Sequence, residues 1–361
     1  MKRFLIRLLW FIAPLAALIV LELFVLPIDF FSFRVWESLY VLQVRGLPPG
    51  RFYPGKTLTK VEPGDLAPYT PYALQKNVMW YTDRYGFRQE ERGAENWSVV
   101  VVGDSGVVGT GLTQDDMVGQ ALERTIHRSV YSYAPFDMNK FVADRHFHDC
   151  PPDTVVLAVM ERSVLLQPAL LPPDANAFDP ESRWKVSLKN SPCVQRALIV
   201  VDRFNKGAML GYFRGRVRSH VLRWIGVSDI ARPRIGNILF FEGESANRPV
   251  SVADEQKAVS TICGYRNYLS ARGIRFVFVG VPNKENFYYD LFPATVKPTF
   301  LPSLLQSLRA AGVETVDLQR PFEVAKSRGE TLYHTDDSHW NARGAELAAQ
   351  EIAKVISFRQ P

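Results

Sequence analysis

Residues 98–111 read SVVVVGDSGVVGTG, four consecutive valines that run directly into a glycine-rich turn. Such a β-branched run predicts a strand that is buried on both faces. Ser105 follows at the carboxyl end of that strand, where open α/β sheets place their ligands. The stretch therefore predicts a parallel sheet with Ser105 at its binding edge.

Similar short apolar runs recur along the chain, separated by segments with helical periodicity. The further predicted strands are 129–134, 154–160, 275–281 and 314–318, and the predicted helices are 114–128, 136–147, 253–272, 298–311 and 342–357. Strands that alternate with helices indicate a parallel sheet covered on both faces. We therefore expect an α/β protein with three α/β/α layers.

The glycines around Ser105 exclude three familiar loops. A nucleophile elbow needs glycine where Val107 stands, and a P-loop needs lysine where Leu112 follows Gly111. The dinucleotide-binding pattern GxGxxG is also absent, because the glycines run GxxGxG. Gly-Asp-Ser remains, and alone it fits either a flexible turn or a serine nucleophile.

A second polar group of residues lies ahead of the last predicted helix, in residues 333–344, YHTDDSHWNARG. A histidine that accepts a proton from serine needs a carboxylate to hold its tautomer, and Asp336 and Asp337 are close to His339 in sequence. Metal binding by His334, His339 and the two aspartates is an alternative, although the spacing matches no zinc signature. A purely structural His-Trp pair is a third interpretation.

Together the two groups resemble the SGNH (GDSL-like) hydrolase superfamily, in its membrane-anchored bacterial form. The resemblance covers about residues 80–357, includes the YTDRYGFR stretch at 81–88, and implies a flavodoxin-like parallel sheet. On this match Ser105 is the nucleophile, His339 the base and Asp336 the acid. No cofactor and no metal are implied.

The Asp-Ser-His-Trp block and residues 281–288, VPNKENFY, are also similar to the SGNH-like domains of alginate and other exopolysaccharide O-acetylation proteins. Those domains carry Asp-x-His-Trp, which would make Asp337 the acid. Their block precedes the serine block, however, whereas here it follows. The serine-first order is that of the wider superfamily, and we therefore take Asp336 as the acid and Asp337 as the alternative.

The chain departs from the superfamily where its other members carry a glycine and an asparagine that bind the oxyanion. The corresponding places hold residues 131–135 and 159–163, which contain neither. Losing one such donor costs about 10²–10³ in turnover. The candidate oxyanion or substrate contacts are then the Ser105 N–H, Gly106, Ala134, Arg162 and Trp340.

Residues 8–28 form an apolar run long enough to cross a bilayer as a helix. Three basic residues precede it, which predicts a cytoplasmic N-terminus at 1–7 and an inner-membrane anchor with the catalytic domain in the periplasm or outside. A cleaved signal peptide is the competing interpretation. Residues 29–79 are predicted to form an extended linker or strap, because 45–74 are dense in proline and glycine.

The net charge of +6 on 361 residues is too mild to indicate nucleic acid binding. Its excess lies in residues 181–234, which hold twelve Lys/Arg against three acids, within a predicted insert at about 163–250. This segment would either bind an anionic membrane or polymer, or form an ordinary solvated helix face. Cys150 and Cys193 could pair and leave Cys263 single, or all three could be free thiols.

These observations predict a serine-dependent esterase or O-acyltransferase that acts on acyl groups of an envelope or secreted polysaccharide, and acetyl is the acyl group that we expect. If a sugar hydroxyl resolves the acyl-enzyme, a multi-pass membrane acyltransferase is the expected partner that supplies the acetyl group. The alternative is a degenerate SGNH domain that binds polysaccharide as a scaffold without turnover.

Overall fold

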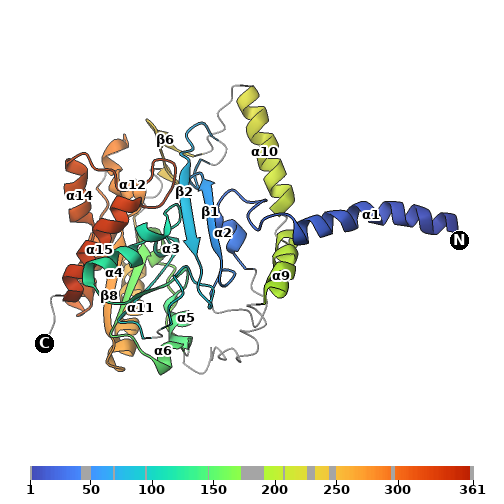
Figure 1. Cartoon of the computed structure of the whole chain (residues 1–361). Coiled ribbons are helices and arrows are strands. Elements are labelled where there is room, and N and C mark those ends of the chain that lie inside the picture. Colours follow the sequence, from blue (N-terminus) through green and yellow to red (C-terminus); the bar gives the residue numbers. More distant parts are fainter. Residues whose placement is uncertain are drawn as a thin grey trace.

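The computed structural model describes residues 2–41, 50–67, 70–93, 96–144, 146–171, 191–205, 208–225, 232–243, 249–293 and 297–357. Figure 1 shows an α/β body from which one N-terminal helix projects, with the C-terminus on the opposite side. Part of the predicted insert, residues 172–190, 206–207, 226–231 and 244–248, lies outside the described residues.

In the described part of the chain, a parallel sheet of five strands forms the centre of the body. In spatial order it contains β4 (Val130–Tyr133), β3 (Val99–Gly103), β5 (Thr154–Met160), β8 (Arg275–Val281) and β9 (Glu314–Asp317). Numbered along the chain, this order is 2-1-3-4-5, the flavodoxin-like arrangement. The predicted parallel sheet is confirmed.

The valines of β3 show why the sheet has two covered faces. Val99 and Val101 are buried on one face with residues of α4 (Val118–Ile126), α14 (Gln319–Ser327) and α15 (Ala342–Ser357). Val100 and Val102 are buried on the other, with residues of α5 (Met138–Ala143), α6 (His146–Asp149), α11 (Val252–Ser270) and α13 (Phe300–Ala310). Successive side chains of a strand point to opposite faces, so the valine run supplies both cores and the three-layer prediction is confirmed.

Short elements follow the carboxyl ends of the strands. They are α3 (Ser105–Val108), the 3₁₀ turn η1 (Gln114–Asp116), α7 (Glu161–Val164), α12 (Lys284–Phe287) and the 3₁₀ turn η4 (Tyr289–Leu291). Ser105 stands in α3 and Lys284 in α12, while Asp337 and His339 stand in the loop before α15.

The predicted linker contains regular structure that its composition does not indicate. It holds α2 (Val35–Leu39) and an antiparallel pair, β1 (Thr57–Glu62) and β2 (Lys76–Tyr81). Trp80 of β2 is fully buried and meets the Phe52 ring edge-on at 5.2 Å. The strands form because they pair with each other and pack on the body, and a local excess of proline and glycine carries no record of such contacts.

The insert between β5 and β8 holds α9 (Pro192–Asn205), α10 (Ala208–Trp224) and a short hairpin of β6 (Arg234–Ile235) and β7 (Ile238–Leu239). Arg214, Arg216 and Arg218 are exposed on α10. The Arg216 guanidinium also lies over the Tyr212 ring at 5.3 Å. Anion binding by this segment stays a prediction.

The predicted membrane span falls largely within α1 (Lys2–Phe24), which contacts α9. The helix is confirmed, but it starts within the basic residues and ends at Phe24 instead of Ile28. Among the residues that the structure describes, no helix has both the length and the apolar character that crossing a membrane requires. The transmembrane anchor is therefore not confirmed, and the outward-facing location stays a prediction.

All three cysteines are free in the structure, with Cys193 exposed and the other two half-buried. The sequence left open a Cys150–Cys193 disulfide or three free thiols, and the structure has three free thiols.

Candidate active site

The Gly-Asp-Ser turn presents Ser105 at the first position of α3. A Cβ on Gly103 would overlap the carbonyl oxygen of Ala158, so β3 can approach β5 this closely only with glycine there. Asp104 caps α3 by accepting the Gly106 N–H at 2.9 Å, and its other oxygen accepts the Met160 N–H at 3.1 Å. The aspartate thus ties the turn that carries Ser105 to the end of β5.

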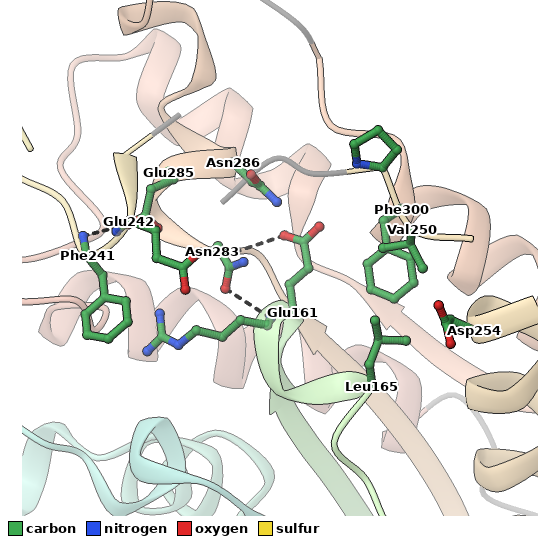
Figure 2. A pocket seen from close by; sticks show the side chains of 12 residues that line it. Glu161, Leu165, Phe241, Glu242, Val250, Asp254, Asn283, Glu285, Asn286 and Phe300 are labelled. Carbon is green, nitrogen blue, oxygen red and sulfur yellow. Dashed lines mark hydrogen bonds between the residues drawn. The ribbon is translucent and has the colours of Figure 1, made fainter. Parts of the chain in front are cut away.

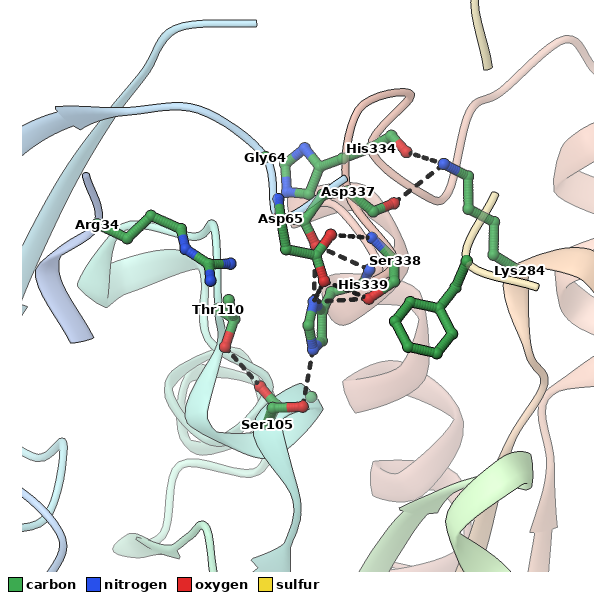
Figure 3. A network of polar contacts seen from close by, with 12 residues as sticks. Arg34, Gly64, Asp65, Ser105, Thr110, Lys284, His334, Asp337, Ser338 and His339 are labelled. Atoms are coloured by element: carbon green, nitrogen blue, oxygen red, sulfur yellow. Dashed lines mark hydrogen bonds and ion pairs between the residues drawn. The ribbon is translucent and has the colours of Figure 1, made fainter. Parts of the chain in front are cut away.

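Ser105, His339 and Asp337 form a continuous chain of hydrogen-bonding groups (Figure 3). Ser105 Oγ lies 2.7 Å from His339 Nε2, and His339 Nδ1 lies 2.6 Å from Asp337 Oδ1. The same carboxylate oxygen accepts the His339 backbone N–H at 3.0 Å. Asp337 is fully buried and His339 is 6% exposed. This is the arrangement of a nucleophile, a base and a carboxylate that orients the base.

Asp336 does not contact His339, and the expectation that it orients the imidazole is wrong. Its carboxylate accepts the N–H groups of Gly64 and Leu74, each at 2.8 Å, and pairs with Lys76 Nζ at 3.0 Å. Residues 335–339 form a turn followed by bends, and in this loop the Asp337 carboxylate reaches the ring while the Asp336 carboxylate is engaged by Gly64, Leu74 and Lys76. Asp336 instead holds the β1–β2 segment against the loop, fully buried.

Asp337 and His339 each stabilise the charged form of the other. Burial by itself would raise the pKa of Asp337, but the charge and hydrogen bond of His339 hold that pKa well below its usual range. Burial likewise acts to lower the pKa of His339, and Asp337 outweighs it, so the pKa of the imidazole lies above the ordinary 6.5. The site therefore favours a positively charged imidazole beside a carboxylate, the state that follows proton transfer from serine.

Asp65 lies in the same cluster, and the sequence analysis did not single it out. Its N–H donates to Asp337 Oδ2 at 2.9 Å, and its carboxylate accepts the Ser338 N–H at 2.7 Å and the Ser338 hydroxyl at 2.6 Å. Asp65 Oδ2 is 3.7 Å from His339 Nδ1. Burial, followed by the Asp337 charge, raises the pKa of Asp65. No local signal marks this residue, because its partners stand more than 270 positions away.

Gly64 explains how the segment between β1 and β2 reaches the loop. A Cβ at this position would overlap the backbone carbonyl group of Asp336. Any other residue would therefore push the segment, and Asp65 with it, away from the aspartates.

Lys284 of α12 holds the loop before α15 through contacts to main-chain oxygens. Its Nζ donates to the carbonyl oxygens of Leu239 at 2.6 Å, His334 at 2.6 Å, Thr335 at 3.1 Å and Asp337 at 3.0 Å. Burial lowers the pKa of Lys284 to about 8. Residue 284 belongs to the VPNKENFY stretch that carried the family resemblance, but its role as a loop anchor had no sequence signal of its own.

The candidate oxyanion and substrate contacts predicted from the sequence lie in different places in the structure. The Gly106 N–H already donates to Asp104, and Trp340 is buried, with its Nε1–H donating to the Gly106 carbonyl at 3.2 Å. Ala134 is buried at the end of β4, next to Pro135 in the wall of the cavity beside Ser105. Arg162 lines a different cavity, although its charge reaches His339 and acts to lower that pKa.

One donor remains directly at the serine. Among the described residues, no hydrogen-bond acceptor faces the Ser105 N–H, because this group starts α3. It therefore remains the best-placed candidate for the oxyanion.

A cavity of about 290 Å³ opens beside Ser105 and His339. Its other walls are mostly apolar or aromatic and come largely from the segment before β1, namely Arg34, Trp36, Tyr40 and Phe52, with Asp65, Val108, Thr110 and Pro135. The cavity can receive a small acyl group next to the serine hydroxyl.

The cluster of Asp65, Asp337 and His339 also has the residue types of a metal site. One ligand atom from each of Asp65, Asp337 and His339 lies within 4.8 Å of the others, so an ion could be held there. His339 Nδ1 is already engaged by Asp337, however, and both Asp65 oxygens accept from Ser338. His334, the other proposed ligand, has a buried Nε2 without a partner, and burial and Lys76 lower its pKa to about 4. The hydrogen bonds fit a proton-transfer chain better than a metal centre.

Comparison with known proteins gives one family match, over the C-terminal part of the chain, and several curated relatives. Residues 238–361 match the family described as "SGNH hydrolase-like domain, acetyltransferase AlgX". A probable alginate O-acetylase AlgJ of Pseudomonas putida is 33% identical over 116 residues, 30% of each chain. The AlgJ proteins of Pseudomonas syringae and Pseudomonas fluorescens are 30% identical over 112 residues and 31% over 102 residues.

The chain spans less than a third of the length of these curated relatives. Ser105 lies outside the residues that match the family, whereas Lys284, Asp337 and His339 lie inside them. The resemblance drawn from the Asp-Ser-His-Trp block is thus confirmed for residues 238–361, which are similar to the SGNH hydrolase-like domains of alginate O-acetylation proteins.

Proposed function

We propose that this chain is a serine-dependent O-acyltransferase or esterase that acts on acetyl groups of a polysaccharide. The observation that carries the proposal is the hydrogen-bonded series of three side chains. Ser105 Oγ lies 2.7 Å from His339 Nε2, and His339 Nδ1 lies 2.6 Å from Asp337 Oδ1. The printed names of the relatives, which are probable alginate O-acetylases, support the polysaccharide and the acetyl group.

In the proposed first half-reaction, Ser105 Oγ attacks the acyl carbonyl carbon and its proton passes to His339 Nε2. Asp337 stabilises the resulting imidazolium, and the Ser105 N–H donates to the developing oxyanion. The leaving alcohol takes the proton from Nε2 as the C–O bond breaks. The product is an acetyl-enzyme on Ser105 with neutral His339.

In the second half-reaction a hydroxyl attacks the acetyl-enzyme while His339 accepts its proton, and Ser105 recovers that proton as it leaves. Water as the attacking group gives an esterase, and a sugar hydroxyl gives a transferase. Both share the first step, and the relatives' names favour transfer. A membrane acyltransferase that supplies the acetyl group is the partner that this version requires.

A fluorophosphonate probe tests the proposal directly, because it is captured only by an activated serine. We expect labelling of the full-length protein and none of Ser105→Ala. Absence of labelling in protein with a normal circular dichroism spectrum would contradict the proposal and favour the polysaccharide-binding scaffold.

The rate of ester hydrolysis should rise with pH through the pKa of His339. The imidazole must be neutral to accept the Ser105 proton, and Asp337 keeps its pKa above 6.5. Activity is therefore low below this pKa and reaches its plateau above it. The measurement is kcat/KM for a small acetyl ester across the neutral range, and a midpoint below 6.5 would contradict the assigned role of Asp337.

Asp65→Asn should shift that profile to lower pH and slow the reaction about tenfold at the plateau. The negative charge of Asp65 raises the pKa of His339, so its removal lowers the midpoint. Weaker hydrogen bonds to Ser338 would hold the neighbouring His339 less firmly, and a tenfold slower reaction corresponds to about 1.4 kcal/mol of activation free energy. Asp29→Asn is the matched control, since Asp29 pairs with Lys60 on β1. A profile of Asp65→Asn that coincides with that of the control would show that Asp65 does not position the base.

A further inference from the structure

A second cavity, of about 240 Å³, lies at the carboxyl ends of β5 and β8 (Figure 2). We call it the β5–β8 cavity. Building on the proposed function, we propose that it binds a neutral pyranose unit of the acceptor polysaccharide, next to the acetylated serine.

Two buried polar atoms in the wall of this cavity have no partner in the structure. Asn286 is only 4% exposed and its Oδ1 accepts no hydrogen bond, while Nη1 of Arg162 donates none. Buried polar groups without partners cost about 1–3 kcal/mol each, so a ligand that supplies the partners is favoured. Sugar hydroxyls can accept from a guanidinium and donate to an amide oxygen, so the hydroxyls of one sugar unit offer partners of both kinds.

Apolar side chains provide another part of the cavity surface, namely Leu165, Phe241, Pro249, Val250 and Phe300. Figure 2 shows Phe241 and Phe300 on opposite sides, with Glu161 and Asn283 between them and Leu165 below. A mixture of aromatic walls and a few fixed polar groups is typical of small-ligand sites. The C–H faces of a pyranose ring would pack on the aromatic rings while its hydroxyls reach the polar atoms.

The charge of the walls indicates a neutral sugar. Four carboxyl groups line the cavity, those of Glu161, Glu242, Asp254 and Glu285, against the single guanidinium of Arg162. Burial already raises the pKa of Glu161, which accepts the Asn283 N–H at 3.1 Å. A further carboxylate, such as that of a uronate, would be repelled at close range in a poorly solvated place.

The cavity is also placed to serve Ser105. β3 and β5 are adjacent parallel strands, so Ser105 and Glu161 follow them at the same edge of the sheet. The Arg162 charge acts on the pKa of His339, which puts this wall within electrostatic reach of the base. A sugar unit held in the β5–β8 cavity would therefore lie at the same edge of the sheet as the serine.

The test measures binding to the full-length Ser105→Ala protein by calorimetry, so that no turnover is needed. The probes are the neutral cellohexaose and mannohexaose and the anionic hexamannuronate. We expect at least one neutral hexasaccharide to bind at least tenfold more tightly than the uronate.

Leu165→Trp fills the cavity, and it should weaken that binding at least tenfold. Leu165 is 40% exposed, so a larger side chain fits without disturbing the core. Leu166→Trp is the matched control, because Leu166 is 78% exposed and is not part of the wall. Val250→Trp fills the cavity from another wall. It shows whether a loss of binding in Leu165→Trp comes from filling the cavity or from a local effect of that one substitution.

Three results would overturn the sugar site: no binding of either neutral probe, equal or tighter binding of the uronate, or unchanged binding in both filling variants. Failure of the proposed function looks different. Wild-type protein would then resist the fluorophosphonate while the neutral sugar still bound and Leu165→Trp still weakened it.

Discussion

Ser105→Ala and His339→Ala are each expected to lower turnover of a small acetyl ester by about 10⁴-fold or more. Ser105 Oγ and His339 Nε2 are 2.7 Å apart, so each depends on the other for the proton transfer. Residues that act as one unit have non-additive effects. The double variant should consequently be little slower than either single one.

The measurement is kcat and kcat/KM for 4-nitrophenyl acetate with matched substitutions of the same residue types elsewhere. Ser327→Ala removes a hydroxyl that donates to the Val324 carbonyl within its own helix, and His220→Ala removes an exposed imidazole on α10. Both controls should retain wild-type rates. A single variant at Ser105 or His339 with near-normal turnover would remove that residue from the mechanism.

The second large effect distinguishes the two adjacent aspartates. Asp337→Asn should lower turnover on the order of 10⁴-fold, because an amide cannot stabilise the imidazolium or hold the required tautomer. Asp336→Asn should retain far more activity and lose stability instead. It breaks a buried ion pair with Lys76 that is worth about 3–5 kcal/mol when one partner is removed.

Turnover and melting temperature measured side by side resolve the two roles. A double variant, Asp336→Asn with Lys76→Gln, should recover part of the stability that Asp336→Asn loses, since no unpaired charge is left. Asp337→Asn should gain nothing from the Lys76 change. Equal losses of turnover in both aspartate variants would contradict the assignment of Asp337.

Much of the fold could be predicted because its evidence is local. Strands buried on both faces need uninterrupted apolar runs, and β5 and β8 have the bounds that their runs predict. Ser105 and His339 were predictable for the same reason, since each stands in a short motif. The choice between Asp336 and Asp337 was not, because Gly64, Leu74 and Lys76 decide which way each carboxylate points.

The residues that sequence analysis missed have only distant partners. Asp65 stands in a stretch whose proline and glycine content predicts a linker, and Lys284 contacts main-chain atoms, which leave no mark in a sequence. Arg162 occupies a place where the family resemblance led us to expect an oxyanion contact, but its side chain lines the β5–β8 cavity instead.

The close approach of Gly64 to Asp336 has a practical consequence for defining the minimal catalytic unit. The family resemblance begins near residue 80, yet the carboxylate of Asp336 receives hydrogen bonds from Gly64 and Leu74, and that of Asp337 receives one from Asp65. A fragment that starts at residue 80 would retain the sheet but leave these carboxylates crowded together without donors. Truncated versions, grafts and chimaeras of this domain therefore need to start ahead of β1, and domain boundaries drawn from the motifs of Ser105 and His339 alone would leave out part of the candidate site.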